Sequence, residues 1–266
     1  MSISTSRRLV LASCAALALG LVACDKKKPP VAPTTTRVYV VGTDAAYAPF
    51  ESQDQQGRIV GFDIDVVSAV AQKAGIEVKF VNTPWEGIFN ALNQGDRDLL
   101  VSAITITDAR RQTMGFTTPY FDAVQLIAVK ADSKVARFDD LKALKVGVQT
   151  GTTGEEAVSK LQGKNSANIK RFESTPLALK ELEAGGVDAV VADNGVVINY
   201  VSNNAGAKFK TVSDASFVPE QYGIAVKQGN AELLAKLNQG LAAIKADGSY
   251  ERIYAKYFGA APAAAK

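Results

Sequence analysis

From residue 38 onward, short apolar segments alternate with longer amphipathic ones, and this alternation restricts the possible folds more than any other feature of the chain. In residues 76–80, apolar and charged side chains alternate with the period of two that is typical of a strand. The stretch before it has apolar residues at helical spacing, with Asp63 placed to cap a helix and Gly75 placed to end it. Because strands that alternate with helices usually form parallel sheets, the sequence predicts an α/β fold with mainly parallel sheets.

The alternation continues to the end of the chain. Pro84 is expected to begin a helix that ends at Gly95, and residues 99–104 are expected to form a buried strand. In the second half, the same criteria predict strands at 145–149, 169–172 and 187–192 and helices at 153–162, 176–184 and 194–202.

An internal repeat indicates two similar lobes. Residues 92–103, LNQGDRDLLVSA, align with residues 182–193, LEAGGVDAVVAD, at a constant offset of 90 residues. Each segment contains a helix end, a glycine turn, an aspartate and an apolar strand. A chain of 266 residues is long enough for two lobes, each with its own core.

The N-terminus indicates export. Two arginines precede the uncharged residues 9–23, which are fewer than the about 20 apolar residues that a membrane-spanning helix needs. Residues 21–24, LVAC, resemble a bacterial lipobox, so residues 1–23 are predicted to be a lipoprotein signal peptide and Cys24 to be lipidated. A plain signal peptide with an Ala-x-Ala-like cleavage site is the alternative. The predicted location is the periplasm, with the chain anchored to a membrane through the lipid.

Two terminal segments are expected to lie outside the folded part. Residues 25–36 contain three lysines, three prolines and three threonines, a composition typical of an extended spacer. Residues 24–36 are therefore predicted to be the lipidated cysteine and a flexible linker. The alanine-rich residues 260–266 are predicted to be a disordered tail.

The composition excludes several kinds of chemistry. The chain has no histidine, which removes Ser/His/Asp and Cys/His catalytic arrangements as well as histidine-ligated metals. The net charge is only +3, and its 30 basic and 27 acidic residues form no long runs, so nothing points to nucleic acid. We expect no metal, no cofactor and no nucleic-acid partner.

Ligands of open α/β sheets bind beyond the carboxyl ends of the strands. The residues at those ends are Asp44, Tyr47, 102–105, 149–153 and Asp193. They supply hydroxyls, backbone amides, an aromatic ring and two carboxylates, which suits a cleft for a polar small molecule.

Five segments of the chain resemble the polar amino-acid-binding proteins of bacterial ABC transporters. They are GTDAAYAPFE (42–51), GFDIDVVSAVA (61–71), SAITITDARR (102–111), FTTPYF (116–121) and QYGIAV (221–226), in the family's order. The resemblance implies a two-lobed periplasmic-binding-protein fold, a flytrap with parallel-rich sheets joined by a two-strand hinge. It implies a first lobe from 37–121 and 223–259, an inserted second lobe from 125–219, and hinge crossings at 120–125 and 219–222.

The resemblance also implies which residues hold the α-groups of an amino acid. Arg110 corresponds to the arginine that binds the α-carboxylate, because a guanidinium can form two parallel bonds with a carboxylate. A surface arginine in a turn is the alternative. Thr105 matches the threonine that contacts the amino and carboxylate groups, and Asp193 matches the aspartate that pairs with the α-ammonium. Asp193 is also placed to cap the helix at 194–202.

Further contacts are implied at both sides of the cleft. Ser102 and Ala103 stand where the family presents side-chain and carbonyl contacts. Thr152 and Thr153, together with Gly151, lie on a loop before a helix, where backbone amides without helical partners attract an anion.

The distal end of the pocket is expected to contain Asp44, Ser102, Gln149 and the aromatic rings of Tyr47 and Trp85, although aromatic residues more often belong to a core. An acidic ligand would face Asp44 with no cation to offset it, whereas a cationic side chain would gain from Asp44 and from ring stacking. Arginine or lysine is therefore predicted first, glutamine or another neutral polar amino acid second, and acidic or aliphatic ligands last.

The predicted function is extracytoplasmic capture of an L-amino acid by a monomer, which closes its two lobes and delivers the ligand to the transmembrane subunits of an ABC permease. The alternative is an enzyme on the same scaffold, similar to cyclohexadienyl dehydratase, with Asp44, Glu51 or Glu173 as the acid. A sensory domain is a third possibility, but no signalling module is seen after Gly259.

Overall fold

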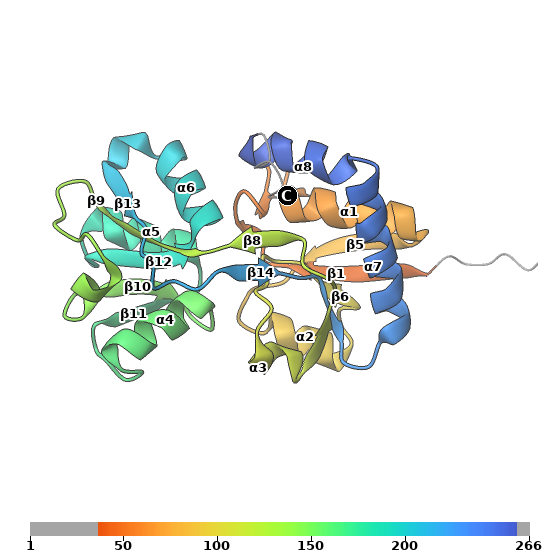
Figure 1. Cartoon of the computed structure of the whole chain (residues 1–266), viewed down its shortest axis with the longest axis horizontal. Coiled ribbons are helices and arrows are strands. Elements are labelled where there is room, and N and C mark those ends of the chain that lie inside the picture. Colours follow the sequence, from red (N-terminus) through yellow and green to blue (C-terminus); the bar gives the residue numbers. More distant parts are fainter. Residues whose placement is uncertain (1–36, 260–266) are drawn as a thin grey trace, which may run out of the picture. The chain divides into compact units, whose positions relative to one another are not determined.

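The computed structural model describes residues 37–259 (Figure 1). A first five-stranded sheet has the order β5-β1-β6-β15-β7. Its strands are β1 (Val38–Thr43), β5 (Glu77–Asn82), β6 (Leu99–Leu100), β7 (Met114–Phe116) and β15 (Ala225–Lys227). Its main helices are α1 (Phe62–Ala74), α2 (Ile88–Gln94), α7 (Ala231–Ala246) and α8 (Ser249–Phe258). Leu99 packs in a core with α1 and α7, whereas Leu100 packs with α2, so helices cover both faces of this sheet.

A second five-stranded sheet has the order β11-β10-β12-β9-β13. Its strands are β9 (Gln125–Lys130), β10 (Val146–Gln149), β11 (Ile169–Phe172), β12 (Ala189–Asp193) and β13 (Phe209–Val212). Its helices are α4 (Thr153–Gln162), α5 (Thr175–Ala184) and α6 (Asn194–Asn203). Val191 packs in the core beneath α4, and Val190 packs in the core beneath α5 and α6.

Two strands connect the sheets. β8 (Phe121–Ala123) and β14 (Glu220–Tyr222) pair antiparallel in a sheet of their own, which lies between the two large sheets in Figure 1. The remaining elements are β2 (Ala46–Tyr47), β3 (Glu51–Gln53), β4 (Ile59–Val60), α3 (Asp108–Arg111) and two short 3₁₀ helices, Phe138–Leu141 and Ala205–Ala207.

These elements confirm the predicted two-lobed α/β class but correct the prediction of mainly parallel sheets. In each sheet, two strand pairings are parallel and two are antiparallel. The reversed strand is β15 in the first sheet and β9 in the second, and each directly follows a hinge strand. Strands β1, β10 and β12 end at the cleft. A strand that follows a hinge strand begins at the cleft instead, so it runs antiparallel to its neighbours in the sheet.

The internal repeat is confirmed as a repeated local structure. Gly95 and Gly185 end α2 and α5 in the left-handed conformation, with φ of 89° and 85°. Asp98 accepts a hydrogen bond from the Val40 amide within β1 at 2.7 Å, and Asp188 accepts one from the Lys145 amide just before β10 at 2.8 Å. In both lobes, the aspartate at the equivalent position of the repeat thus joins the glycine turn to the sheet by a hydrogen bond.

Three local predictions were wrong. Helix α2 begins at Ile88 rather than at Pro84, because Gly87 has a φ of 106° that no helix continues through. The strand predicted at 99–104 ends at Leu100, after which the chain turns toward the cleft. Asp63 is not a cap, because it lies inside α1 and is fully buried.

The predicted signal peptide (1–23), the linker with Cys24 (24–36) and the tail (260–266) lie outside the described residues. Within residues 37–259, no helix is both long and apolar enough to cross a bilayer.

Candidate functional site

One cavity brings together the residues that the sequence analysis nominated for binding, with the exception of Gly151. Its lining consists of Asp44, Tyr47, Trp85, Ser102, Ala103, Thr105, Arg110, Gln149, Thr152, Thr153 and Asp193. Residues 44–110 belong to the part of the chain around the first sheet and residues 149–193 to the part around the second. The cavity is therefore built from both lobes, and the role of each residue toward a ligand stays a prediction.

Arg110 lies in α3, the short helix that Thr107 caps by accepting a hydrogen bond from the Arg110 amide at 3.2 Å. Its guanidinium donates to the carbonyl of Thr105 at 2.9 Å and to the carbonyl of Gly151 at 3.2 Å. Those bonds use two of the five N–H donors of the group. Burial lowers the pKa of Arg110, but a guanidinium stays protonated in proteins. Arg110 is therefore a permanent cation whose remaining N–H groups are available to a ligand.

Aromatic rings surround this cation. The guanidinium carbon lies 5.4 Å from the centroid of the Trp85 ring and 5.2 Å from that of Phe89. The two rings meet edge to face at 5.1 Å. Trp85 stands on the turn before α2 instead of inside the helix, and this position lets its ring line the cavity.

Asp193 ends β12 and is 7% exposed. Its Oδ2 accepts hydrogen bonds from the hydroxyls of Tyr47 at 3.0 Å and Tyr222 at 2.5 Å, and its Oδ1 accepts one from Gln125 Nε2 at 2.5 Å. Burial, followed by the charge of Glu220, raises the pKa of Asp193 to about 6. Asp193 occupies the N-cap position of α6, but its side chain makes no capping bond, so its polar atoms serve the cleft.

The distal end of the cavity contains Asp44 and Gln149. Burial raises the pKa of Asp44. The amide of Gln149 is held on both sides, because Nε2 donates to the carbonyl of Glu173 at 3.1 Å and Oε1 accepts from the Thr175 hydroxyl at 3.0 Å. Among the lining residues, Asp44 and Asp193 are the carboxylates and Arg110 is the cation.

Two buried carboxyl groups support the Ser102–Ala103 turn from behind. Ser102 Oγ donates to Glu51 Oε1 at 2.8 Å, and the Ala103 amide donates to Asp63 Oδ2 at 2.8 Å. Ala103 has a φ of 46°, a left-handed conformation that is unusual for a residue with a side chain. Burial raises the pKa of both groups, that of Glu51 well above its usual range and that of Asp63 to about 6. The actual role of Asp63 is therefore to hold the cavity wall.

The acids nominated for the enzyme alternative do not all reach the cavity. Glu51 is fully buried behind Ser102, and Glu173 presents its backbone carbonyl to Gln149. Neither lines the cavity, so of those three acids only Asp44 belongs to its lining.

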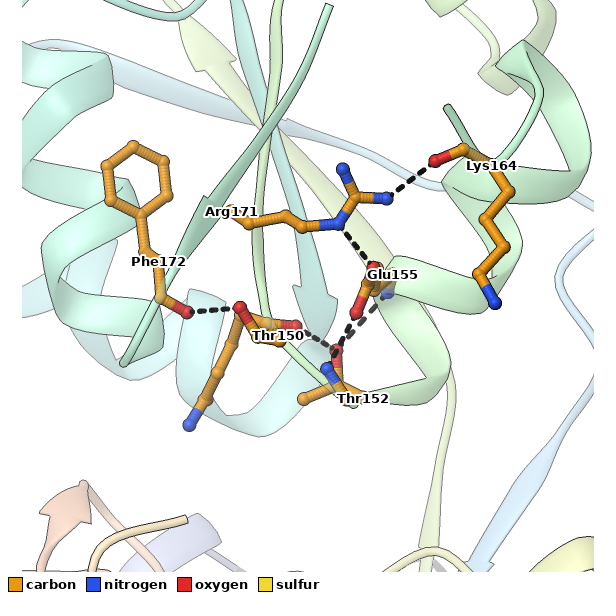
Figure 2. A network of polar contacts seen from close by, with 8 residues as sticks. Thr150, Thr152, Glu155, Lys164, Arg171 and Phe172 are labelled. Carbon is orange, nitrogen blue, oxygen red and sulfur yellow. Dashed lines mark hydrogen bonds and ion pairs between the residues drawn. The ribbon is translucent and has the colours of Figure 1, made fainter. Parts of the chain in front are cut away.

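The loop before α4 is braced by a charged network, which Figure 2 shows. Glu155 accepts a hydrogen bond from the Gly151 amide at 2.6 Å and forms an ion pair with Arg171 at 2.6 Å. The Thr152 hydroxyl caps α4 by accepting from the Glu155 amide at 3.2 Å. The prediction that Gly151 offers a free amide to an anion is therefore wrong, because Glu155 occupies it.

Three residues near the cavity were missed from the sequence: Gln125, Glu220 and Tyr222. They lie on or beside the hinge strands and bond to cavity residues from outside the lining. Tyr222 belongs to the QYGIAV segment (221–226). Glu220 lies two positions before Tyr222, within the hinge crossing expected at 219–222. The signal that could have identified Glu220 was its carboxylate in a strand that passes between two lobes. Within residues 37–259, no group of three or more cysteine or carboxylate side chains is arranged to hold a metal ion.

Comparison with known proteins agrees with this geometry. The chain is 44% identical over 256 residues to the probable histidine-binding protein of Neisseria gonorrhoeae, covering 95% of this chain and 96% of that protein. It is 35% identical over 218 residues to the putative ABC transporter arginine-binding protein 2 of Escherichia coli K12, covering 81% and 88%. Among solved structures, the arginine-, lysine-, histidine-binding protein ArtJ of Geobacillus stearothermophilus matches with a TM-score of 0.82 at 44% identity, covering 85% of this chain and 97% of that one.

The family model described as bacterial extracellular solute-binding proteins, family 3, matches residues 39–260, nearly all of the part that the structure describes. These relatives are named as binding proteins, and one of them as part of an ABC transporter. The chain belongs to the bacterial extracellular solute-binding proteins of family 3.

Proposed function

We propose that this protein binds a cationic L-amino acid in the cavity between its lobes and delivers it to the transmembrane subunits of an ABC transporter. The observation that carries the proposal is that Arg110 and Asp193, which come from different lobes, line the same cavity. A guanidinium and a carboxylate in one cavity match the α-carboxylate and the α-ammonium of an amino acid. Arginine, lysine and histidine are the ligands named for the relatives.

The charges of the lining favour a cationic side chain. The α-groups of a bound amino acid would neutralise Arg110 and Asp193, which leaves Asp44. A ligand guanidinium, ammonium or imidazolium would neutralise Asp44, whereas a ligand carboxylate would repel it. The Trp85 ring adds a flat face for a cation. We therefore expect arginine, lysine or histidine to bind more tightly than glutamine, and glutamine more tightly than glutamate or leucine.

Binding is expected to favour the closed arrangement of the lobes. Arg110 and Thr105 come from the first lobe, and Asp193 and Thr153 from the second. A ligand that contacts all four stabilises only the state in which the lobes lie together, so it shifts the population toward that state. The transporter would then recognise the closed form.

The decisive experiment is an equilibrium titration of the mature chain with each of the twenty amino acids, by thermal shift and then by calorimetry. A ligand at 100 times its dissociation constant stabilises the fold by about 2.7 kcal/mol, which moves the melting temperature by several degrees. We expect the largest shift from arginine, lysine or histidine, and no turnover of prephenate or arogenate. The tightest binding by glutamate or leucine would contradict the ligand class, and turnover would favour the enzyme alternative.

We also propose a periplasmic location with a lipid anchor at Cys24, a residue outside the described part of the chain. The LVAC segment supports this proposal. Cell fractionation of the wild-type chain and of Cys24→Ala tests it. The wild type should follow the membranes and detergent, and the variant should stay uncut or become soluble. A soluble wild type whose processing is unchanged by the substitution would contradict the anchor.

A further inference from the structure

Glu220 begins the hinge strand β14, and its carboxylate contacts both lobes. Its Oε2 accepts the hydroxyl hydrogen of Thr105 at 2.6 Å and that of Thr153 at 2.8 Å. Thr105 pairs with Tyr222 at the edge of the first lobe, and Thr153 is the first residue of α4 in the second lobe. One oxygen of the hinge therefore joins two cavity residues that are far apart in the chain.

This arrangement determines what the two hydroxyls can offer to a ligand. A hydroxyl has one hydrogen to donate and two lone pairs to accept with, whereas an ionised carboxylate only accepts. Thr105 and Thr153 both spend their single hydrogen on Glu220. Since both residues line the cavity, their hydroxyls can present only lone pairs to its interior. Thr153 has one lone pair left for this, because its oxygen also accepts a hydrogen bond from Gln125 Nε2 at 3.2 Å.

The same carboxylate is linked to the acidic group of the cavity. Gln125 Nε2 donates to Glu220 Oε1 at 2.9 Å and to Asp193 Oδ1 at 2.5 Å. The amide thus holds two carboxylates near each other, and the charge of Glu220 contributes to the raised pKa of Asp193. The end of the cavity beside Asp193 therefore combines the lone pairs of two threonines with the charge of two carboxylates. This environment favours a cationic donor such as an ammonium.

We infer that Glu220 is a positioning residue, which selects ligands with an α-ammonium by turning the hydroxyls of Thr105 and Thr153 into acceptors. The inference deepens the proposed function and rests on it. Glu220 does not line the cavity, so its effect passes through the two threonines and Gln125. Its loss should therefore affect a ligand that carries an α-ammonium more than an analogue that lacks one.

The test measures two dissociation constants for the mature chain by calorimetry. One ligand is whichever of arginine, lysine or histidine binds the wild type most tightly, and the other is its analogue without the α-amino group. In Glu220→Gln, an amide nitrogen at the Oε2 position can accept from neither threonine, so both hydroxyls must turn their hydrogens away from it. An amide nitrogen at the Oε1 position would instead meet the Gln125 donor and break that link to Asp193. We expect the affinity for the amino acid to fall at least tenfold and that for the analogue less than threefold.

Asp139→Asn is the matched control. Asp139 is an exposed carboxylate in the 3₁₀ helix Phe138–Leu141 that lines a groove outside the cavity together with Glu220 but makes no hydrogen bond to either threonine. Its substitution removes the same charge and should change both affinities less than threefold.

Substitutions at Thr153 provide an independent test that does not depend on the folding of Glu220→Gln. Thr153→Val removes the hydroxyl and should weaken the amino acid selectively, whereas Thr153→Ser, which keeps the hydroxyl, should restore the preference for the amino acid over its analogue. Equal losses for both ligands in Glu220→Gln, or wild-type affinities in Thr153→Val, would overturn the inference. A wild type that binds no amino acid would instead contradict the proposed function.

Discussion

The hydroxyl of Tyr47 donates a hydrogen bond to Asp193 Oδ2 at 3.0 Å, which joins β2 of the first lobe to the end of β12 in the second. Tyr222 of the hinge donates to the same oxygen. All of these donors are neutral, so none of the described hydrogen-bond partners of the buried carboxylate carries a positive charge. A ligand ammonium would supply that charge, which explains why closing the lobes and binding an amino acid should occur together.

Arg110 is expected to dominate the binding of the α-carboxylate. Arg110→Ala should leave the fold intact and weaken binding by roughly 1.5–3 kcal/mol, because a charge-assisted contact is lost. Arg110→Lys should recover little, since an ammonium cannot donate two parallel bonds. Arg111→Ala, which removes a neighbouring exposed cation outside the cavity lining, is the control for calorimetric titration. Wild-type affinity in Arg110→Ala would show that the carboxylate binds elsewhere.

Asp193 should make binding dependent on pH. Its pKa is about 6 because it is buried and faces Glu220, yet it must be ionised to pair with an ammonium. As the pH falls below 6, the affinity should decrease by up to about tenfold per pH unit, and binding should release a proton. Calorimetry in buffers of different ionisation enthalpy measures that proton. Asp193→Asn should bind more weakly and with a smaller dependence on pH, because Asp44, whose pKa burial also raises, can still titrate. A wild-type affinity that is constant from pH 5 to 7 would contradict the assignment.

Asp44 should distinguish cationic ligands from neutral ones. In Asp44→Asn, the affinity for arginine should fall at least tenfold, whereas that for glutamine should change less than threefold, because only arginine loses an opposite charge. Asp96→Asn, an exposed carboxylate outside the cavity, controls for the change in net charge. Equal losses for both ligands in a titration series would show that Asp44 does not face the ligand's side chain.

Trp85 is the only tryptophan of the chain, so it reports directly on the cavity. Its ring lies 5.4 Å from the Arg110 guanidinium carbon, and a ligand between the lobes would change its surroundings. Its emission should shift on titration with the ligand, and Trp85→Leu should weaken a cationic ligand by about 0.5–2 kcal/mol. An emission spectrum that does not respond to a ligand with a measured affinity would place the ring away from the bound molecule.

The sequence was sufficient to predict which residues line the cavity. It was not sufficient to predict the residues outside the lining that hydrogen-bond to them and fix their positions. The lining residues follow strands or begin helices, and such positions can be recognised from local patterns and motif order. Glu220 and Thr105 are 115 residues apart, and nothing local in the sequence indicates that bond. The reversed strands β9 and β15 were missed because strand direction depends on where the chain enters the sheet. Pro84 favoured a helix start, but the conformation of Gly87 delayed it to Ile88.

The buried pair Glu51 and Asp63 should determine how the stability of the ligand-free chain varies with pH. Both pKa values are raised, first by burial and for Glu51 also by the charge of Asp63, so these two groups hold more protons in the folded chain than in the unfolded one above about pH 4.5. Their contribution to the free energy of unfolding should therefore be largest below that pH and should fall as the pH rises through 6. Glu51→Gln keeps the shape of the side chain and replaces the O–H donor of the protonated carboxyl by an N–H donor, but it removes the ionisation. It should flatten this decrease and should be more stable than the wild type at pH 8.

Urea unfolding at pH 5 to 8, followed by circular dichroism, measures the difference. Glu77→Gln, at an exposed site, is the control, and parallel curves for Glu51→Gln and the wild type would show that Glu51 does not carry the extra proton.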